Sequence, residues 1–558
     1  MNRVTVAIVV VDLQRSRLGL PSCAGVTLAG RPTLHHTLLR IGCVAAVNRV
    51  IVLHPPGQNV AALLQGFDCG KPLHIQVDEA VRGDAYTARL VASRKWSRSA
   101  WRGGLGGMTC YDELLPAAPM SRALHDAGAE SALLVGGDWP LVDPALCQRV
   151  LELHLQTPEQ MQMTFTQAPP GLAGVAIART LLEQLAEHPE ASFGQMLGYN
   201  PTVPQADPIG RDVCVQIDSA VRSFTHRMIF DSPRSVRLIE RIAGVLGDKL
   251  VDADAAAIVA AASKLPEPLS HIVPLPSQVT LELTPRRLVT GPVTPQHDVT
   301  LQRDDMDESL ALRIVEQLGD ASVGDVTLTL GGLGDALLHP SWLAVARAAK
   351  QAGVASVHVE TDLLCETDEV MKLLDGCVDV VSVRLNADTA KVYEAAMGAD
   401  LFAKVIENVL ALLNERNRRT VAGTGAAGVP WIVPRLVKTS ETLADLETFY
   451  DRWIHFSGHA VIDPFTEGCG LSPSRSPVDM APPKRRACRQ IDRRMTIHSD
   501  GTVALCDQDW LGRGSVGNAS VSSLKELWAA MKPVQTLHTL GKWSESPLCG
   551  KCKQWHRP

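Results

Sequence analysis

Six short apolar segments alternate with helical segments between residues 279 and 463, and this alternation constrains the fold more than any other feature of the chain. The expected strands are residues 279–283, 326–330, 356–360, 380–385, 431–436 and 460–463. Apolar residues at helical spacing fall at 310–318, 342–352, 401–413 and 443–453. Because a helix between two strands returns the chain to the same edge of a sheet, this alternation predicts a parallel, partly closed β/α barrel.

A chain of 558 residues is too long for one hydrophobic core, so two to four domains are expected. An alanine run at 255–262 leads into a proline-rich stretch at 266–276. Prolines at this density disfavour regular structure, which places a domain boundary here. The expected parts are a first domain at 1–250, an Ala/Pro-rich linker at 251–278, the barrel at 279–487 and a small C-terminal domain at 488–558.

The first domain opens with a β-α-β pattern, formed by an apolar strand at 4–11, a helix near 33–41 and a strand at 49–53. Ligands bind at the carboxyl ends of such parallel strands. Arg15 and Arg17 follow the first strand and are candidate phosphate ligands, because guanidinium groups match phosphate oxygens. Asp138 follows another strand, at 132–135, where a carboxylate suits Mg²⁺. The alternative role for Asp138 is to cap the helix that begins near Asp143.

Four of the thirteen cysteines lie beyond residue 487, namely Cys488, Cys506, Cys549 and Cys552. Thiolates are the ligands that iron-sulfur clusters and zinc require, and a C-x-x-C pair brings two sulfurs to one centre. A turn signal at 499–502 predicts a hairpin that ends at Cys506. A structural zinc site is the alternative, although a zinc ribbon usually supplies a C-x-x-C pair at each end.

The order of features beyond residue 487 resembles the SPASM or twitch extension of radical S-adenosylmethionine enzymes. These features are a single cysteine, a hairpin ending in Cys506, a turn at Gly517 and Asn518, a helix at 522–531 and a final C-x-x-C-x-x-W. The resemblance implies that the four cysteines hold an auxiliary 4Fe-4S cluster. We expect them to converge on one centre that leaves no open iron, and the other nine cysteines to stay apart from it.

The barrel segment resembles the core of the same enzymes. The glycine-rich stretch that begins at Gly331 and Gly332 and contains Asp335 is similar to a family segment that approaches the amino group of S-adenosylmethionine. These three residues are therefore candidate cofactor ligands. Gly331 and Gly332 are equally well explained as packing positions in a tight loop after a strand.

The stretch Glu282 to Arg286 also matches the family, which continues with three cysteines that hold a 4Fe-4S cluster. In this chain the three positions are Arg287, Gly291 and Thr294. Without three thiolates such a cluster cannot be held and no 5′-deoxyadenosyl radical is made by that route. The segment therefore resembles a radical enzyme without its reactive centre, and S-adenosylmethionine is not expected as a cofactor.

The first domain resembles the cytidylyltransferase-type sugar nucleotidyltransferases of the GT-A fold, a Rossmann-like architecture. The matching stretches are the first loop at 16–18, the turn that carries Asp138 and a later segment that carries Asp231. The resemblance implies that Asp138 and Asp231 share a Mg²⁺ ion and that Arg15 and Arg17 face a nucleoside triphosphate. The family lysine of the first loop is missing, and Asp12 stands where a carboxylate would repel phosphate.

The net charge of -6 and the pI near 6.3 give no reason to expect nucleic acid or an anionic membrane as a partner. No apolar stretch is long enough for a transmembrane helix, and the run at 4–11 is too short for a signal peptide. Thirteen unevenly spaced cysteines in a chain without an export signal fit a reducing compartment. We therefore expect a cytoplasmic protein.

The leading hypothesis is an α/β iron-sulfur protein that joins a nucleotidyltransferase-like domain to a degenerate radical S-adenosylmethionine and SPASM module. Its expected partners are a nucleotide, a sugar and a redox protein, in sugar or cell-surface glycan metabolism. One alternative is an active sugar cytidylyltransferase whose remaining part is a scaffold. The other is a non-catalytic iron-sulfur binding or regulatory protein.

Overall fold

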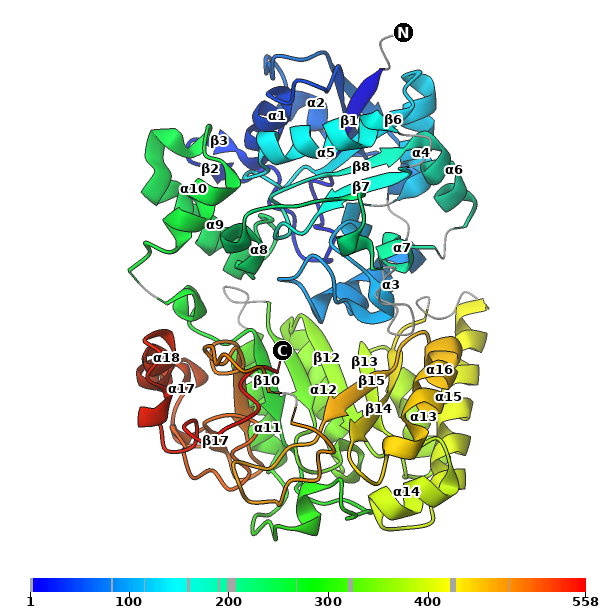
Figure 1. The fold of residues 1–558 in the computed structure, drawn as a ribbon, viewed down its shortest axis with the longest axis vertical. Coiled ribbons are helices and arrows are strands. Elements are labelled where there is room, and N and C mark those ends of the chain that lie inside the picture. The colour runs from blue at the N-terminus through cyan, green and yellow to red at the C-terminus, as the bar shows by residue number, and fades with distance from the viewer. Residues whose placement is uncertain are drawn as a thin grey trace. The chain divides into compact units, whose positions relative to one another are not determined.

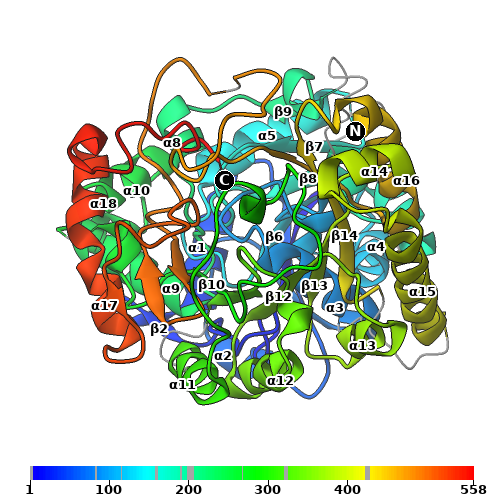
Figure 2. The same cartoon turned by 90° about the horizontal axis from the view of Figure 1, so that it is seen from below.

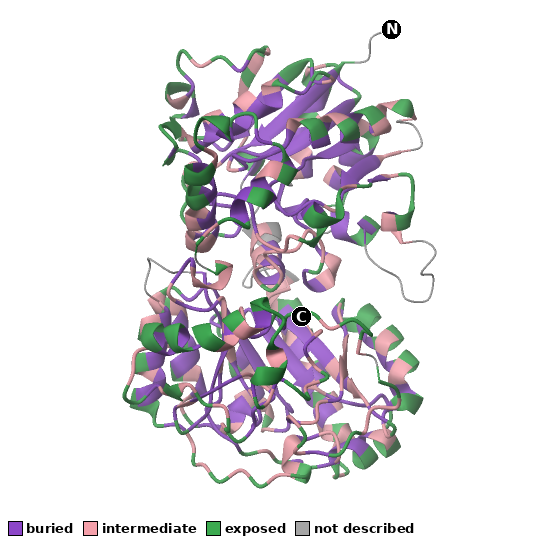
Figure 3. Ribbon diagram, turned by 60° about the vertical axis from the view of Figure 1, so that its left-hand side comes forward, coloured by how far each residue is buried: buried purple, intermediate pink, exposed green. Residues whose placement is uncertain are grey.

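The computed structural model describes residues 4–81, 84–114, 116–157, 161–188, 191–197, 207–266, 268–319, 325–421, 428–479 and 481–557. The chain divides into two compact units, Met1–Leu269 and Ser270–Pro558. Each unit has its own sheet (Figure 1). Buried residues concentrate in the sheets, whereas the outer faces of the helices are exposed (Figure 3).

The first unit is built on a sheet of seven strands in the order β5-β4-β1-β6-β8-β7-β9. The strands are β1 (Thr5–Val10), β4 (Arg49–His54), β5 (Leu73–Val77), β6 (Ser131–Gly136), β7 (Met163–Thr166), β8 (Val175–Ala178) and β9 (Cys214–Val215). β1, β4, β5 and β6 are parallel, whereas β8 runs antiparallel to both of its neighbours. Every residue of β1 and β6 is buried, as expected for central strands covered on both faces. A small separate hairpin pairs β2 (Thr27–Leu28) with β3 (Arg31–Pro32).

The helices of this unit pack on and beside the sheet. They are α1 (Thr33–Gly42), α2 (Val60–Leu63), α3 (Asp84–Lys95), α4 (Ala117–Asp126), α5 (Pro144–Gln156), α6 (Arg179–Glu187), α7 (Phe193–Leu197), α8 (Ser219–Ser223), α9 (Pro233–Leu246) and α10 (Ala255–Ala262). The alanine run expected in the linker is helix α10, which packs on α8 and α9.

Two side chains tie the segment before α10 to the body of the first unit. The buried guanidinium of Arg40 donates to the carbonyl oxygens of Leu250 and Val251, each over 2.8 Å. The carboxylate of Asp143 accepts the backbone N–H of Ala255 over 2.8 Å. Residues 251–262 are therefore part of the first unit, and the division between the units falls inside the stretch expected as a linker.

The second unit is built on a sheet of nine strands in the order β15-β14-β13-β12-β11-β10-β16-β17-β18. The barrel strands are β10 (Gln278–Leu281), β11 (Thr327–Leu330), β12 (Ser356–Thr361), β13 (Val380–Arg384), β14 (Trp431–Lys438) and β15 (Val461–Pro464). All six are parallel to their neighbours and lie close to their expected bounds. Figure 2 shows the helices around the outer side of these strands. The helices are α11 (Glu308–Leu318), α12 (Trp342–Ala352), α13 (Thr367–Met371), α14 (Ala390–Met397), α15 (Phe402–Val421) and α16 (Leu446–Ser457).

The C-terminal segment continues the barrel sheet. Strand β16 (Arg494–Ile497) pairs in parallel with β10, and β17 (Thr502–Ala504) and β18 (Gly517–Asn518) follow in antiparallel pairing. The expected hairpin is present, with Gly501 at φ +82° in its turn. Helices α17 (Leu524–Ala530) and α18 (Lys532–Thr539) follow, and a capping box of Ser523 and Glu526 begins α17.

Among the helices that the structure describes, none has both the length and the apolar character needed to cross a lipid bilayer.

Candidate functional site

Five cysteines surround one narrow cavity in the second unit. The residues that line it are Cys469, Arg485, Cys488, Gln490, Ile491, Cys506, Gln508, His538, Leu548, Cys549, Cys552, Gln554 and Trp555. The four cysteines that the sequence singles out are all among them. The fold thus brings these four cysteines to one cavity.

Different elements position these four thiols. Cys506 follows β17 at the end of the hairpin. The backbone N–H of Cys488 donates to Nδ1 of His538 on α18 over 3.1 Å. Cys549 and Cys552 share a turn in which the N–H of Cys552 donates to the carbonyl of Cys549 over 3.2 Å. The turn is fixed from outside by Arg485, whose Nη2 donates to the Cys549 carbonyl over 2.5 Å.

A fifth cysteine, Cys469, also lines the cavity, together with Cys506. The expectation that the other nine cysteines stay apart from the site is therefore wrong for Cys469. The physical reason is that the loop after β15 folds back over the loop after β17, so two segments that are distant in the sequence meet. Its flanking residues, Gly468 and Gly470, were the only local signal of a special turn.

The cavity is an environment suited to thiolate ligands. Burial raises the pKa of Cys549, and it raises the pKa of Cys552 to about 11, so that these thiols keep their protons unless a cation stabilises the thiolates. Four polar side-chain atoms that belong to lining residues are buried without a hydrogen-bond partner in the described part of the chain. They are Nε of Arg485, Nε2 of His538, Oε1 of Gln508 and Oε1 of Gln554. Thiols and unpartnered polar groups around one cavity fit an iron-sulfur cluster.

The five thiols are spread around the cavity rather than drawn onto one point. Within the described residues, no group of three His, Cys, Asp or Glu side chains lies close enough to coordinate a single metal ion.

The three barrel positions where the resemblance calls for cysteines are occupied by side chains that pack or pair. Arg287 forms a buried ion pair with Asp362, in which Nε donates over 2.9 Å. A methyl group on Gly291 would lie 2.2 Å from the backbone carbon of Met397, so only glycine fits. The hydroxyl of Thr294 donates to the Gly291 carbonyl over 2.8 Å. The loop at 287–294 is thus stabilised by the ion pair of Arg287, the close packing of Gly291 and the hydrogen bond of Thr294.

The glycine-rich stretch after β11 also has structural partners. Arg384 donates to the carbonyl of Gly332 over 2.7 Å, and Gly332 has a φ of +98°. A methyl group on Gly331 would lie 2.8 Å from Cβ of Glu360. The carboxylate of Asp335 accepts the N–H of Asp362 over 2.9 Å, and burial followed by the charge of Asp362 raises the pKa of Asp335 to about 6. Gly331 and Gly332 thus have the close contacts of packing positions, the alternative considered for these two residues, and Asp335 has a backbone partner in Asp362.

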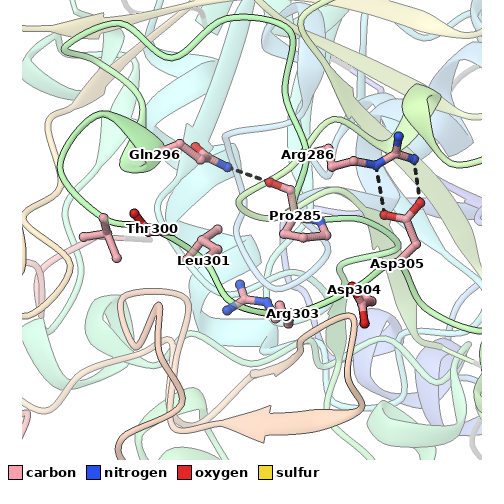
Figure 4. Close-up of a pocket in the computed structure, with 9 residues that line it drawn as sticks. Pro285, Arg286, Gln296, Thr300, Leu301, Arg303, Asp304 and Asp305 are labelled. Atoms are coloured by element: carbon pink, nitrogen blue, oxygen red, sulfur yellow. Dashed lines mark hydrogen bonds and ion pairs between the residues drawn. The ribbon is translucent and has the colours of Figure 1, made fainter.

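A larger concavity of about 720 Å³ lies in the loop after β10 (Figure 4). Its lining residues are Pro285, Arg286, Gln296, Val299, Thr300, Leu301, Arg303, Asp304 and Asp305. Arg286 is paired with Asp305 over 2.5 Å, and Nε2 of Gln296 donates to the Pro285 carbonyl over 2.9 Å. Arg303 forms a pair with the buried Glu282 over 2.6 Å.

In the first unit, Asp138 and Asp231 lie close enough for their charges to interact. Burial and then the charge of Asp231 raise the pKa of Asp138 to about 7. The backbone N–H of Phe230 donates to the Asp138 carbonyl over 2.7 Å, which joins the two segments at the carboxyl end of β6. Asp231 is also paired with Arg227 over 2.6 Å, and Arg227 in turn with the buried Glu113. Arg227, which the sequence did not single out, thus balances the charge of Asp231, one of the two candidate metal ligands.

The two candidate phosphate ligands differ. The side chain of Arg15 is exposed, whereas Nε of Arg17 donates to the Glu113 carbonyl over 2.7 Å. Asp12 accepts the backbone N–H of Gln14 over 2.8 Å and so shapes the loop. The cap of α5 is Asp143, which accepts the N–H of Ala145 over 2.7 Å. The capping role considered for Asp138 therefore belongs to Asp143.

A family model supports the assignment of the C-terminal segment. Residues 488–553 match SPASM, an iron-sulfur cluster-binding domain. The chain therefore carries a SPASM iron-sulfur domain at its C-terminal end, and the prediction of an iron-sulfur protein is confirmed at this level.

The remaining comparisons are more distant. An uncharacterized protein of Treponema pallidum is 27% identical over 256 residues, which are 45% of this chain and 70% of that protein. The chain is also similar to the Streptococcus suis SuiB structure bound to S-adenosylmethionine (TM-score 0.40, 12% identity, 61% of this chain and 88% of that chain). The structure of BtrN in complex with AdoMet and 2-DOIA gives a TM-score of 0.34 at 13% identity and covers 50% of this chain and 93% of that chain. A cytidylyltransferase from Leptospira borgpetersenii gives a TM-score of 0.32 at 12% identity and covers 47% of this chain and 94% of that chain. TM-scores of 0.40 or lower support no conclusion about the function of this chain.

Proposed function

We propose that Cys488, Cys506, Cys549 and Cys552 hold one 4Fe-4S cluster with a structural or electron-relaying role. The observation that carries the proposal is that four cysteines of a segment matching an iron-sulfur domain line one cavity. Four thiolates fill the terminal positions of such a cluster and leave no iron open to a substrate. The cluster supplies reversible one-electron transfer when bound, and a redox protein is the partner that this chemistry requires.

The residues of the cavity have separate tasks. The four thiols lose their protons and bind iron. Arg485 fixes the turn of Cys549 and Cys552 through the backbone carbonyl of Cys549. Ile491, Leu548 and Trp555 limit the access of water, which protects the site from hydrolysis and oxidation.

An anaerobic measurement of iron and acid-labile sulfide, with an absorption spectrum, tests this proposal. About four irons and four sulfides per chain are expected for one cluster of this type. Cys549→Ser should lose most of both, whereas Cys377→Ser, which removes a buried cysteine outside the cavity, should keep the wild-type content. Zinc in place of iron, or full iron in Cys549→Ser, would refute the cluster assignment.

For the barrel we propose that no 5′-deoxyadenosyl radical is formed. The support is the identity and packing of the three positions where the resemblance requires cysteines, in particular the buried pair of Arg287 with Asp362. Incubation of the reconstituted protein with dithionite and S-adenosylmethionine should give no more 5′-deoxyadenosine than a control without enzyme. An excess over that control would overturn this part of the proposal.

A second candidate function is nucleotidyl transfer by the first unit, with a nucleotide and a sugar as ligands. The specific observation in favour is the proximity of Asp138 and Asp231 at the carboxyl end of β6. Two adjacent buried carboxylates raise each other's pKa, and a cation between them would stabilise both charges. Mg²⁺ would bind between them, and Arg15, whose side chain is exposed, is placed to contact a triphosphate.

Release of pyrophosphate from CTP and Mg²⁺ with a panel of acidic sugars tests the second function. Asp138→Asn should abolish the release, whereas Asp126→Asn, an exposed aspartate at the end of α4, should not change it. If the protein carries a full cluster but releases no pyrophosphate with any of the sugars, nucleotidyl transfer by the first unit is refuted and the cluster proposal stands.

A further inference from the structure

Cys469 lies in a loop whose backbone is unusual. Gly468, Cys469 and Gly470 have φ angles of +54°, +52° and +86°. A positive φ is uncommon for a residue with a side chain, so the fold holds Cys469 in this conformation. A methyl group on Gly468 would lie 2.4 Å from the ring of Trp510, which shows how closely this loop approaches the loop after β17.

Hydrogen bonds fix the same loop at both ends. The carbonyl of Glu467 accepts the backbone N–H groups of Gly470 and Ser472, each over 3.0 Å. Nη2 of Arg513 donates to the Cys469 carbonyl over 3.2 Å. Arg513 belongs to the loop that follows Cys506, and the two loops that carry Cys469 and Cys506 are therefore held together.

The position of the two thiols decides what Cys469 can do. Cys469 and Cys506 both line the cavity of the other three cysteines, and Arg513 joins the loop of Cys469 to the loop that follows Cys506. One 4Fe-4S cluster takes four terminal ligands, so this cavity holds one thiol more than the cluster needs. The loop of Cys469 packs on the loop that follows Cys506, so these two thiols are the pair that can exchange. We propose that Cys469 is an alternative ligand for the iron that Cys506 binds, an inference that rests on the proposed cluster.

The exchange is balanced without an oxidant or a reductant. One iron–sulfur bond, to Cys506, breaks as another forms to Cys469. The proton of the Cys469 thiol would pass to the Cys506 sulfur that leaves the iron. The number of ligands and the charge of the site are unchanged. A cluster with such a reserve ligand keeps all four terminal ligands when one thiol is lost.

Iron and sulfide content after anaerobic reconstitution tests this inference on the full chain. Cys469→Ser and Cys506→Ser should each retain the wild-type content, and the double variant should fall to the background of Cys549→Ser. Cys377→Ser is the control for loss of a cysteine elsewhere. Far-UV circular dichroism shows whether each variant is folded, and the absorption spectrum of folded Cys506→Ser shows whether its cluster is of the wild-type kind.

The outcomes separate this inference from the cluster itself. A wild-type protein without iron and sulfide removes the cluster and the inference together. A wild-type cluster that is lost in Cys506→Ser, or in Cys469→Ser, overturns the alternative role and leaves the cluster standing. A double variant with full iron content shows that neither thiol is a ligand and also overturns the inference.

A different observation concerns His538, which is 2% exposed and lines the cavity. Its Nδ1 accepts the N–H of Cys488 over 3.1 Å, so Nδ1 carries no proton and the ring proton is on Nε2. Nε2 is buried without a hydrogen-bond partner in the described part of the chain. The geometry points to His538 as a positioning residue whose Nε2–H donates to a sulfur of the bound cluster or of a ligand thiolate. Such hydrogen bonds raise the reduction potential, because they stabilise the more negative reduced state.

Two variants separate the ring nitrogens. His538→Asn keeps an acceptor at the δ position for Cys488 and removes the ε donor, whereas His538→Gln keeps a donor at the ε position. The reduction potential of the cluster in the full chain should fall in His538→Asn and stay near the wild-type value in His538→Gln, with unchanged iron content in both. A wild-type potential in His538→Asn, or equal shifts in the two variants, overturns the role of the Nε2–H group.

Discussion

Asp138 and Asp231 show how burial and charge act on single residues of the first unit. Arg227 pairs with Asp231 and balances its charge, whereas Asp138 faces the neighbouring carboxylate. Burial and then the charge of Asp231 raise the pKa of Asp138 from 3.8 to about 7. A carboxyl group that binds its proton more tightly in the folded state makes the free energy of unfolding fall as the pH rises between these two values.

Asp138→Asn should remove this pH dependence. At pH 8 the variant is expected to be more stable than the wild type by up to about 4 kcal/mol, at about 1.4 kcal/mol per pKa unit. At pH 4 the difference should nearly vanish, because the wild-type group is then protonated. Hydrogen exchange of the β6 amides in the full chain measures the effect, with the exposed Asp126→Asn as the control. Equal stabilisation at both pH values would contradict the assigned pKa.

In the second unit, buried and exposed ion pairs offer a matched comparison. The side chains of Arg287 and Asp362 are 4% and 0% exposed, whereas those of Arg347 and Asp375 are 55% and 35% exposed. Arg287→Met leaves a buried carboxylate unpaired and should lower the free energy of unfolding by about 3–5 kcal/mol. Arg347→Met should cost less than about 1 kcal/mol. Denaturant unfolding checks both, and equal costs would show that burial of the pair is not decisive.

Secondary-structure elements differ in how much they depend on the exact residue at each position. Helix α9 is exposed at Gly244, where a methyl group would meet no other atom within 4 Å. In the loop after β11, a methyl group on Gly334 would lie 1.8 Å from the carbonyl oxygen of Thr284. A side chain therefore fits at Gly244, whereas the backbone of Thr284 excludes one at Gly334.

Alanine at these two positions should therefore have opposite effects. Gly244→Ala is expected to stabilise the first unit by about 0.5–1 kcal/mol, because alanine favours a helix interior over glycine. Gly334→Ala should destabilise the second unit by more than about 2 kcal/mol, because the backbone must shift. Thermal unfolding of the two variants checks both signs. Little change in Gly334→Ala would show that the loop adjusts without cost.

At the scale of the whole molecule, each unit has its own sheet and its own buried residues. The first unit includes α10 and ends at Leu269. A fragment of residues 1–269 should therefore fold cooperatively by itself, as measured by circular dichroism and denaturant unfolding. A fragment without a cooperative transition would show that the first unit needs the second.

Loss of the cluster should affect only one unit. The SPASM segment extends the barrel sheet through the pairing of β16 with β10, so Cys549→Ser should speed hydrogen exchange in β16 and β17. Exchange in β1 and β6 of the first unit should not change. Faster exchange in both units would show that the cluster stabilises the whole chain.

The alternation of strands and helices is a local property, and the sequence by itself determined it. Apolar runs of strand length, separated by helical periodicity, placed all six barrel strands, because the buried positions of strands such as β13 and β14 are mostly apolar. The four cysteines of the SPASM segment were found in the same way, from their order around a turn signal. The hairpin before Cys506 follows from turn residues that need no distant partner.

Only the tertiary structure decided which distant side chains meet. Cys469 lines the same cavity as Cys506 because two loops pack together. Arg227 forms an ion pair with Asp231, and Arg287 pairs with Asp362, 75 positions away in the chain. The alanine run after residue 254 is helical by its sequence, but only its packing on α8 and α9 shows that it belongs to the first unit and not to a linker. These contacts depend on how whole elements are placed, and neither local propensity nor hydrophobic periodicity records that placement.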